Sequence, residues 1–340
     1  MAKRGSSGIC RLIGINKPIG LSSHEVVNRV RRIYNEKRVG HAGTLDPLAS
    51  GVLLVCVGPA TRLDAFLVGH GKRYRMGVMF GASTTTDDSE GSVVKTASIP
   101  DECSNLDFAQ RYVSGLLGKG EQIPPIYSAI KVNGKKAYEQ ARRGNVIDLV
   151  PRSFEIYDAS CQGIQEKERL DGQPGVEWLC EMSVSSGTYM RSIARDMGRD
   201  LHSAAYVSSL ERTISGTVLL EDCVTLEQLE QDSTAGGIDP VQALGIRFAF
   251  VRNEIADRVE HGSWLKDTDI ALNEPILPEL SGSCTCTTSV RPSLKPPTHE
   301  EVIGVIVNNR LKAIYEFKES EHRYVPRCVF SIGVERGSTI

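Results

Sequence analysis

One carboxylate in a loop punctuated by glycines is the first candidate for chemistry in this sequence. The loop reads Gly40-His41-Ala42-Gly43-Thr44-Leu45-Asp46-Pro47, and Asp46 is its single acid. The glycines permit tight backbone turns, and Pro47 disfavours helical dihedral angles at Asp46. An acid held in a rigid loop beside a histidine and near several cations suggests chemistry on an anionic polymer. The alternative is an ordinary Asp-Pro turn without a catalytic role.

The residues on either side of this loop predict the elements that position it. Ser22 and Glu25 have the spacing of a capping box, and apolar residues then recur on one helical face through Ile33. The apolar run 52–57 predicts a buried strand directly after the loop. A second strand over 72–80 places alternate residues, Tyr74 among them, on one face.

Two later segments are basic. Arg191, Arg195 and Arg199 recur every four residues along a predicted helix, which indicates a positive stripe on one face. Residues 121–147 are long, basic and irregular, with tyrosines interleaved. Such a segment is suited to clamping RNA through phosphate contacts and base stacking. The alternative is an exposed loop with a short helix.

Charge and cysteine content narrow the class of protein. Residues 1–150 contain 21 Lys and Arg against 13 Asp and Glu, a local charge of +8, so the remainder carries −10 in a chain of net charge −2. A basic half that holds the candidate loop favours a phosphate-rich partner. Nine scattered cysteines without CxxC spacing indicate a reducing compartment and no structural metal. Without a membrane-length apolar run or a signal peptide, we expect a cytoplasmic protein.

Composition also predicts the domain order. We expect a small β-rich domain at the C-terminus, because Asn308-Asn309 between two short apolar runs predicts a hairpin. A stretch rich in Pro, Ser, Thr and Cys predicts an irregular loop inside that domain. The expected parts are a flexible N-terminal arm over 1–10, a catalytic domain over 11–232 with an insertion at about 121–147, a linker over 233–247, and the β-rich domain over 248–340 with its loop at 267–300.

Taken together, these motifs resemble those of the bacterial tRNA pseudouridine synthase B (TruB-like) family. The resemblance covers about residues 9–230 and consists of six motifs in the family's order. They are the Asp46 loop, Asn16-Lys17-Pro18, Gly58-Pro59-Ala60-Thr61-Arg62, Lys72-Arg73-Tyr74, the family's thumb insertion with Ile123-Pro124-Pro125 and Gly134-Lys135-Lys136, and Ser186-Gly187-Thr188-Tyr189-Met190-Arg191. The C-terminal part resembles, more weakly, a PUA-like RNA-binding domain.

The resemblance implies an α+β fold, with a central mixed, largely antiparallel sheet flanked by helices and a small C-terminal β-barrel. It implies isomerisation of the T-loop uridine of tRNA (position 55) to pseudouridine, without cofactor or metal. The nucleotide is flipped out, its bond at N1 is broken, and the base rejoins the ribose through C5. The implied partner is the T-stem-loop of tRNA, with no membrane, no obligate protein partner and a monomeric chain.

Two alternatives stay open. One is the related catalytic subunit that works with guide RNA and protein partners, although the insertion after Pro124 and the polar turn over 83–91 favour the form that acts alone. The other is a tRNA-binding or folding module without chemistry, although binding alone has no need of a catalytic acid. Modification of a bare tRNA transcript separates these alternatives.

The resemblance also implies roles for individual residues. Asp46 is the implied nucleophile, Tyr74 stacks on the flipped base, and Arg191 pairs with the nucleophile and holds it ionised. His41 fills the space that the base leaves, while Tyr189 and Leu210 shape the pocket. The remaining substrate-binding residues are cations, namely Lys17, Arg62, Lys135, Lys136, Arg142 and Arg143.

The chain departs from the family at three positions. Asn16 and Thr85 stand where the family usually has aspartate, and Arg62 stands where it usually has lysine. The change at Thr85 puts a role for the polar turn over 83–91 in question, although Asp87 and Asp88 follow closely. The motif around Asp46 is intact.

Overall fold

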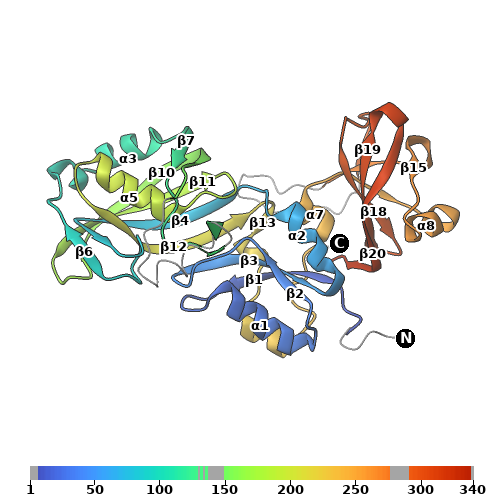
Figure 1. The fold of residues 1–340 in the computed structure, drawn as a ribbon, viewed down its shortest axis with the longest axis horizontal. Coiled ribbons are helices and arrows are strands. Elements are labelled where there is room, and N and C mark those ends of the chain that lie inside the picture. The colour runs from blue at the N-terminus through green and yellow to red at the C-terminus, as the bar shows by residue number, and fades with distance from the viewer. Residues whose placement is uncertain (1–6, 129–130, 133–134, 137–148, 276–290, 338–340) are drawn as a thin grey trace. The chain divides into compact units, whose positions relative to one another are not determined.

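The computed structural model describes residues 7–128, 131–132, 135–136, 149–275 and 291–337 (Figure 1). The chain forms two compact units. Unit 1 comprises Met1–Asp46, Gly51–Gly69 and Ile214–Ile340, and unit 2 comprises Pro47–Ser50 and His70–Thr213. The predicted α+β class is confirmed, because helices accompany a largely antiparallel sheet and a separate C-terminal sheet follows.

The N-terminal part of unit 1 contains the elements predicted around the Asp46 loop. Strand β1 (Arg11–Lys17) and strand β2 (Val39–Ala42) both pair antiparallel with β3 (Ala49–Val57). Helix α1 (Ser23–Tyr34) begins with the predicted capping box, since the Ser22 side chain accepts from Glu25 N and the Glu25 carboxylate accepts from Ser22 N. Two short helical segments follow β3, namely η1 (Gly58–Leu63) and α2 (Asp64–Leu67).

Residues 7–10, the described part of the predicted N-terminal arm, are held against unit 1. The backbone N–H and the hydroxyl of Ser7 both donate to Glu36 Oε2 at 2.9 Å. Cys10 is fully buried, and its carbonyl accepts from Glu335 N at 2.8 Å. This part of the arm therefore has fixed partners.

The C-terminal part of unit 1 is mainly β-structure. Short elements lead into it: β13 (Val218–Leu219), η3 (Leu220–Asp222), α6 (Leu226–Gln231) and α7 (Pro240–Leu244). The second sheet has the order β15-β20-β19-β18-β14-β16-β17. Its strands are β14 (Phe248–Phe250), β15 (Leu265–Lys266), β16 (Asn273–Glu274), β17 (Arg291–Pro292), β18 (Val302–Val307), β19 (Arg310–Lys318) and β20 (Arg323–Glu335), with helix α8 (Asn253–Glu260) and the turns η4 (Asp267–Asp269) and η5 (Glu319–Glu321) between them.

The hairpin predicted at Asn308-Asn309 is confirmed. These residues join β18 to β19 with φ of 49° and 55°, which are left-handed values that asparagine tolerates. Within the region predicted as an irregular loop, β16 and β17 pair with each other, and residues 276–290 lie outside the described part. Leu12 and Leu54 share one hydrophobic cluster with Ile306 and Phe330, so the C-terminal sheet and the β1–β3 pair have a common core.

Arg247 anchors the segment before β18. Its guanidinium donates to Glu301 Oε1 at 2.6 Å, to Ser293 Oγ at 2.8 Å and to the Lys295 carbonyl at 2.7 Å, and it is 9% exposed. We expect Arg247→Met to lower the free energy of unfolding by about 3 kcal/mol, because it leaves a largely buried carboxylate without its cation. The 55%-exposed Arg327 is the matched control, because its partner Glu316 keeps Lys318 as a second cation. Arg327→Met, measured in the same urea titration, should change stability by less than about 1 kcal/mol. Equal losses in the two variants contradict the anchoring role.

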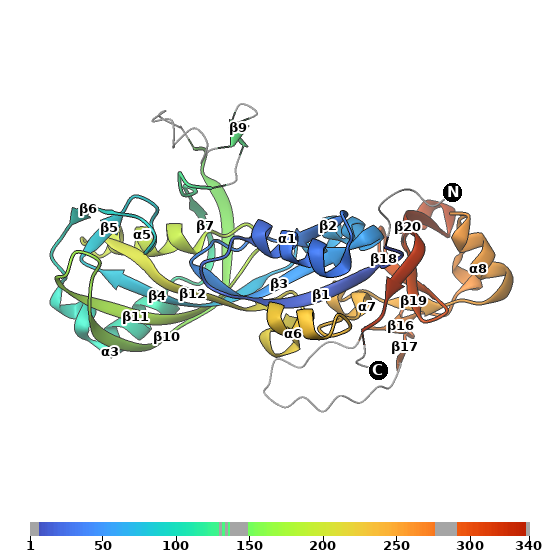
Figure 2. The same ribbon diagram turned by 90° about the horizontal axis from the view of Figure 1, so that it is seen from below.

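Unit 2 contains a sheet in which the neighbouring strands run in the order β12-β4-β11-β10-β7, as Figure 2 shows for the first four. The strands are β4 (Lys72–Phe80), β7 (Gly118–Gln122), β10 (Arg152–Glu168), β11 (Pro174–Val184) and β12 (Ala205–Ser215). Trp178 of β11 packs against Phe80 of β4 with ring centroids 4.7 Å apart. Helices α3 (Leu106–Ser114) and α5 (Met190–Asp200) lie beside each other (Figure 1). The Tyr112 hydroxyl of α3 donates to the Asp200 carboxylate of α5 at 3.1 Å.

Smaller elements of unit 2 surround this sheet. The pair β5 (Ala82–Thr84) and β6 (Val93–Thr96) encloses the predicted polar turn, and η2 (Asp101–Ser104) precedes α3. In the predicted insertion, β8 (Lys131–Val132) pairs with β9 (Lys135–Lys136). Lys135 and Lys136 are thus placed on one strand, and Arg142 and Arg143 lie outside the described residues.

Candidate active site

Helix α1 fixes the backbone directly before Asp46. The Ser23 hydroxyl, at the first residue of this helix, donates to the Leu45 carbonyl and accepts from Leu45 N, both at 2.8 Å. Ser23 and Leu45 are buried, and Gly43 adopts a φ of +87° that other residues rarely adopt. Asp46 is half-buried at the end of this constrained loop. The capping helix predicted from the sequence therefore sets the position of the candidate nucleophile.

His41 lies on β2, opposite Val55 of β3, on the way into this loop. Burial raises the pKa of the nearby Asp64 carboxyl, and the electrostatic interaction with His41 opposes that increase. His41 is thus part of a fixed polar environment in unit 1.

The two cations predicted in unit 1 both make structural hydrogen bonds. Lys17 is fully buried, and its ammonium donates to the carbonyls of Pro18 and Leu21 at 2.8 and 2.6 Å. These bonds close the turn that leads into α1. Arg62 donates to the Val329 carbonyl of β20 at 2.7 Å, which ties η1 to the C-terminal sheet.

Strand β4 contributes a buried tyrosine to unit 2. Tyr74 is 8% exposed and pairs with Met182 of β11, on the buried face predicted from the alternation of the strand. Leu210 is buried on β12, which is the other neighbour of β4. Lys72, two residues before Tyr74, is also buried. Burial and the positive charge of the fully buried Arg212 lower the pKa of the Lys72 ammonium to about 8.

Arg191 is buried at the start of α5 and pairs with Asp88. Its Nη1 lies 3.3 Å from Asp88 Oδ2, and the two side chains are 6% and 2% exposed. The same guanidinium donates to the carbonyls of Thr86 and Tyr127, each at 3.0 Å. The pairing of Arg191 with Asp46 stays a prediction, and Asp88 is the partner found within unit 2.

The polar turn over 83–91 is built to hold Asp88. Its Oδ1 accepts from the Thr86 hydroxyl and from Glu90 N, and its carbonyl accepts from the Thr84 hydroxyl at 2.6 Å. Thr85, one of the three departures, closes the turn by exchanging backbone and hydroxyl hydrogen bonds with Ser92. The role that sequence analysis left in question is therefore structural support for the ion pair of Arg191.

Asp87 and Asp88 are the residues that sequence analysis did not assign to the site. The available signal was charge complementarity, because an acid pair in a polar turn matches arginines spaced four residues apart on a helix. Arg195 pairs with Asp87 at 3.0 Å, so two of the three arginines in the predicted positive stripe have acidic partners in the polar turn. The third, Arg199, is 75% exposed and pairs with Asp196 of its own helix.

Tyr189 directly precedes α5. Its backbone N–H donates to Oε1 of the buried Gln122 at 3.1 Å, at the end of β7. The start of α5 is thereby attached to the strand from which the insertion leaves the sheet.

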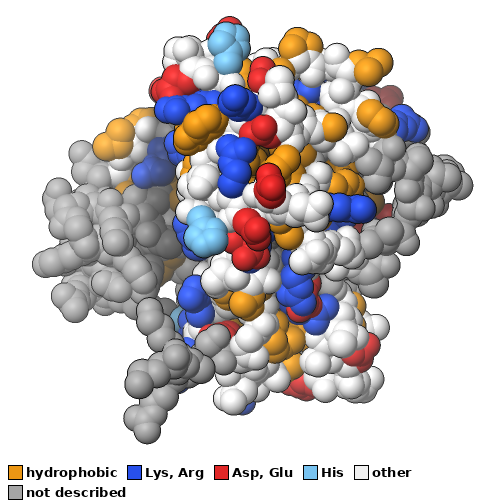
Figure 3. All heavy atoms as spheres, turned by 90° about the vertical axis from the view of Figure 1, so that its right-hand side faces the viewer, with side chains coloured by type: hydrophobic (Ala, Val, Ile, Leu, Met, Phe, Trp, Pro, Cys, Tyr) orange, Lys and Arg blue, Asp and Glu red, His pale blue; other side chains and the backbone are white. Residues whose placement is uncertain are grey.

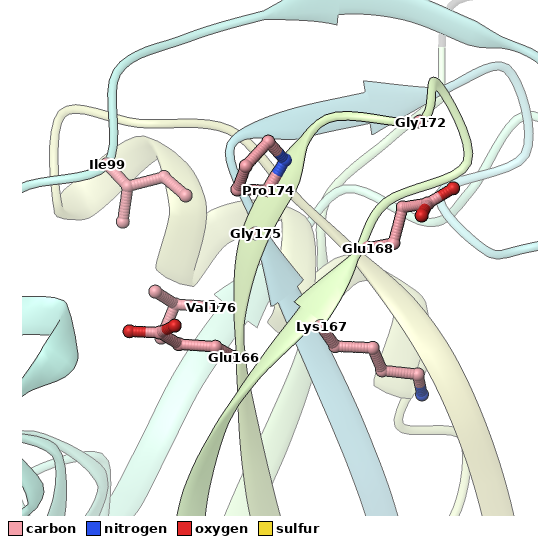
Figure 4. A pocket seen from close by; sticks show the side chains of 8 residues that line it. All are labelled: Ile99, Glu166, Lys167, Glu168, Gly172, Pro174, Gly175 and Val176. Atoms are coloured by element: carbon pink, nitrogen blue, oxygen red, sulfur yellow. The ribbon is translucent and has the colours of Figure 1, made fainter.

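A pocket of unit 2 lies away from these residues, at the turn between β10 and β11 (Figure 4). Glu166 and Glu168 line it but point in different directions, and Lys167 pairs with Glu177 at 2.9 Å. Its carboxylates therefore do not converge on a common point. Among the described residues, no three His, Cys, Asp or Glu side chains are grouped to hold a metal ion. No helix in the described part is long and apolar enough to cross a membrane.

On the right-hand side of Figure 1, basic and acidic side chains are interspersed over the surface, as Figure 3 shows. Several basic residues of the C-terminal sheet and its helix have acidic partners. The ion pairs are Arg258–Asp269, Lys312–Glu260, Arg323–Glu321 and Arg327–Glu316.

Comparisons with known proteins agree with the fold and the motifs. The model of the TruB family pseudouridylate synthase N-terminal domain matches residues 31–190. The tRNA pseudouridine synthase B of Bacillus cereus is 34% identical over 302 residues, which cover 87% of this chain and 97% of that protein. The enzyme of the same name from Geobacillus thermodenitrificans is 38% identical over 285 residues, covering 82% and 91%.

Two solved structures share the fold. One is a chain from an H/ACA RNP bound to a substrate RNA containing 2′-deoxyuridine, with a TM-score of 0.63 and 21% identity, covering 95% of this chain and 85% of that one. The other is a chain from a Cbf5-Nop10-Gar1 complex, with a TM-score of 0.61, 22% identity and the same coverage. The similarity to the Bacillus and Geobacillus proteins over most of its length shows that this chain belongs to the TruB family of pseudouridylate synthases.

Proposed function

We propose that this protein isomerises the T-loop uridine of tRNA, at position 55, to pseudouridine. The observation that carries the proposal is 34% identity to a tRNA pseudouridine synthase B over 87% of this chain. The intact Asp46 loop, held by α1, supports it. The protein acts as a monomer in the cytoplasm, where it meets tRNA, and uses no cofactor or obligate protein partner.

The reaction needs no external reactant. The N1–C1′ bond breaks, the base rotates, and a C5–C1′ bond forms; N1 gains a proton and C5 loses one, so that the product is an isomer. Asp46 acts as the nucleophile that starts the sequence, at the base or at the ribose carbon. Because stacking hides the uridine in the T-loop, the nucleotide is first flipped into the protein, and His41 fills the vacated space.

The proposed site residues of unit 2 bind the flipped base and stabilise the negative charge of Asp46. Tyr74 stacks on the flipped uracil from its fixed place on β4, and Tyr189 and Leu210 shape the pocket around it. Arg191 pairs with Asp46 as well as Asp88, so that a positive charge favours the ionised nucleophile. Lys17 supports RNA binding through the turn that it closes before α1, and Arg62 does so through its hydrogen bond to the Val329 carbonyl.

The alternative of a guide-dependent subunit is less well supported. The chain is 34–38% identical to two proteins that are named tRNA pseudouridine synthase B. It is 21–22% identical to the chains from the H/ACA RNP and the Cbf5-Nop10-Gar1 complex. We expect the purified protein to convert an unmodified tRNA transcript in the absence of any other RNA or protein. Digestion of the transcript to nucleosides and chromatographic separation of pseudouridine from uridine measure the product. Conversion only after a guide RNA is added contradicts the proposal.

We propose that the insertion at about 121–147 binds tRNA phosphates through Lys135, Lys136, Arg142 and Arg143. The logarithm of the binding constant falls as the logarithm of the salt concentration rises, and each phosphate contact contributes about 0.7–0.9 to the steepness of that fall. Replacing all four residues by glutamine should therefore make the negative slope shallower by about 3. Filter binding of tRNA over a range of salt concentrations measures the slope. The matched control changes the charge equally, by glutamine at Arg258, Lys312, Arg323 and Arg327, whose acidic partners are on the C-terminal sheet, its turns and helix α8. If the insertion variant keeps the wild-type slope, this segment does not bind phosphates.

The domain boundaries predicted from the sequence are part of the proposal. The catalytic domain spans 11–232, and the PUA-like RNA-binding domain spans 248–340. Because Arg258, Lys312, Arg323 and Arg327 of the latter are paired with acids, we expect its contribution to the salt dependence to be small.

A further inference from the structure

Two arginines of α5 connect the same two segments of unit 2. Arg191 reaches Asp88 in the polar turn with Nη1 and the Tyr127 carbonyl with Nη2. Arg195, one helical turn later, repeats this arrangement: Nη1 donates to Asp87 Oδ2 at 3.0 Å and Nη2 donates to the Ile123 carbonyl at 2.7 Å. We call Arg191 and Arg195, with these four partners, the α5 bracket.

The polar turn is the fixed side of the α5 bracket. Asp87 has a left-handed φ of 61°, and its carbonyl accepts from Val207 N on β12 at 3.0 Å. Ser89 N in turn donates to the Val207 carbonyl at 2.9 Å, so the turn is attached to the central sheet on both sides of Asp88. The carboxylate that Arg195 meets is therefore held in place by backbone contacts.

The other side of the α5 bracket is the beginning of the insertion. Residues 123–127 follow β7 directly, and the carbonyl of Ile123 accepts a second hydrogen bond from the fully buried Ser192, at 2.8 Å. This carbonyl is therefore bound by two successive turns of α5. Charge-assisted hydrogen bonds of this kind are about twice as strong as neutral ones.

We infer that Arg195 is a positioning residue that aligns Arg191 by seating the base of the insertion against α5 and the polar turn. The inference rests on the proposed function and adds a residue to it. Arg195 itself has no part in the chemistry. Since Arg191 and Arg195 share a helix and both partner segments, displacing Ile123 also displaces the Tyr127 carbonyl that Arg191 binds.

The competing role for Arg195, which is 27% exposed, is a phosphate contact with tRNA. The two roles have different kinetic signatures. Loss of a phosphate contact weakens tRNA binding and lowers its salt dependence. Loss of alignment leaves binding unchanged and slows the isomerisation of bound tRNA, because small misplacements of catalytic groups are costly.

The test compares Arg195→Met with Arg199→Met under single-turnover conditions, with enzyme in excess of labelled tRNA. Arg199 is the matched control, since it lies on the same helix, is 75% exposed and pairs with Asp196. We expect Arg195→Met to lower the single-turnover rate by about tenfold or more, with a Kd for tRNA within about twofold of wild type. Arg199→Met keeps the wild-type rate.

Two further variants guard against loss of folding as the cause. Arg195→Lys keeps a cation for Asp87 but loses the planar two-armed contact, so its rate falls between wild type and Arg195→Met. Asparagine tolerates the left-handed backbone at position 87, so Asp87→Asn removes the ion pair without straining the turn. Because both substitutions remove the same contact, the double variant Asp87→Asn/Arg195→Met should be no slower than Arg195→Met alone. Urea titration of each variant confirms that it is folded at the assay temperature.

A wild-type single-turnover rate in folded Arg195→Met overturns the inference. An equal loss of rate in Arg199→Met also overturns it, because removing any positive charge from α5 would then have the same effect. A raised Kd with an unchanged rate assigns Arg195 to phosphate binding and also overturns it. If the wild-type protein itself forms no pseudouridine, the proposed function fails, and that result is distinct from all of these.

Discussion

Asp46→Asn should lower the rate of pseudouridine formation by about a thousandfold or more, because removal of a nucleophile eliminates the covalent route. Asparagine has nearly the shape of aspartate, so the loop held by Ser23 and Leu45 is expected to keep its conformation. The Kd for tRNA should stay within about threefold of wild type, since phosphate contacts supply most of the affinity. Single-turnover assays and filter binding on the same preparation measure both quantities.

The control for this prediction is the same substitution at an exposed acid. Asp107 lies in the first turn of α3 and is exposed, so Asp107→Asn should have the wild-type rate. Turnover by Asp46→Asn comparable to that of Asp107→Asn would remove Asp46 from the mechanism.

Arg191→Met should impair both stability and activity, for separable reasons. The substitution leaves Asp88, 2% exposed, without its cation, and we expect the free energy of unfolding to fall by about 3–5 kcal/mol. Activity should fall by about a hundredfold or more, because the guanidinium no longer stabilises the ionised nucleophile. Urea titration and single-turnover kinetics report the two effects.

The double variant Arg191→Met/Asp88→Asn separates them. Asparagine at position 88 removes the unpaired buried charge, so the double variant should recover most of the lost stability. It should not recover activity, since Arg191 is still absent. If activity returns together with stability, Arg191 only supports the fold, and its proposed role toward Asp46 is wrong.

Features that depend on neighbouring residues were predictable from the sequence. The capping box at Ser22 and Glu25 and the hairpin at Asn308-Asn309 are local patterns, and the structure confirms both. The buried face of β4 follows from simple alternation, which placed Tyr74 correctly.

Features that depend on tertiary pairing were not predictable. The arginines of α5 read as a positive stripe, yet Arg191 and Arg195 lie against Asp88 and Asp87 from a distant turn. The burial of Lys72 near Arg212 could not be predicted either. The periodicity of a helix or strand indicates which face is apolar, but it does not show which charged residues are buried together. A single sequence shows that such charges are complementary, but it does not show which of them meet in the fold.

The most direct test of the central claim uses a tRNA transcript labelled with tritium at C5 of its uridines, mixed with the purified wild-type protein and no other macromolecule. Forming the new bond at C5 expels that hydrogen, so we predict release of one equivalent of tritium per tRNA. A transcript with cytidine at position 55 should release none. Absence of release from the first transcript, despite measured binding, or equal release from both, would contradict the account.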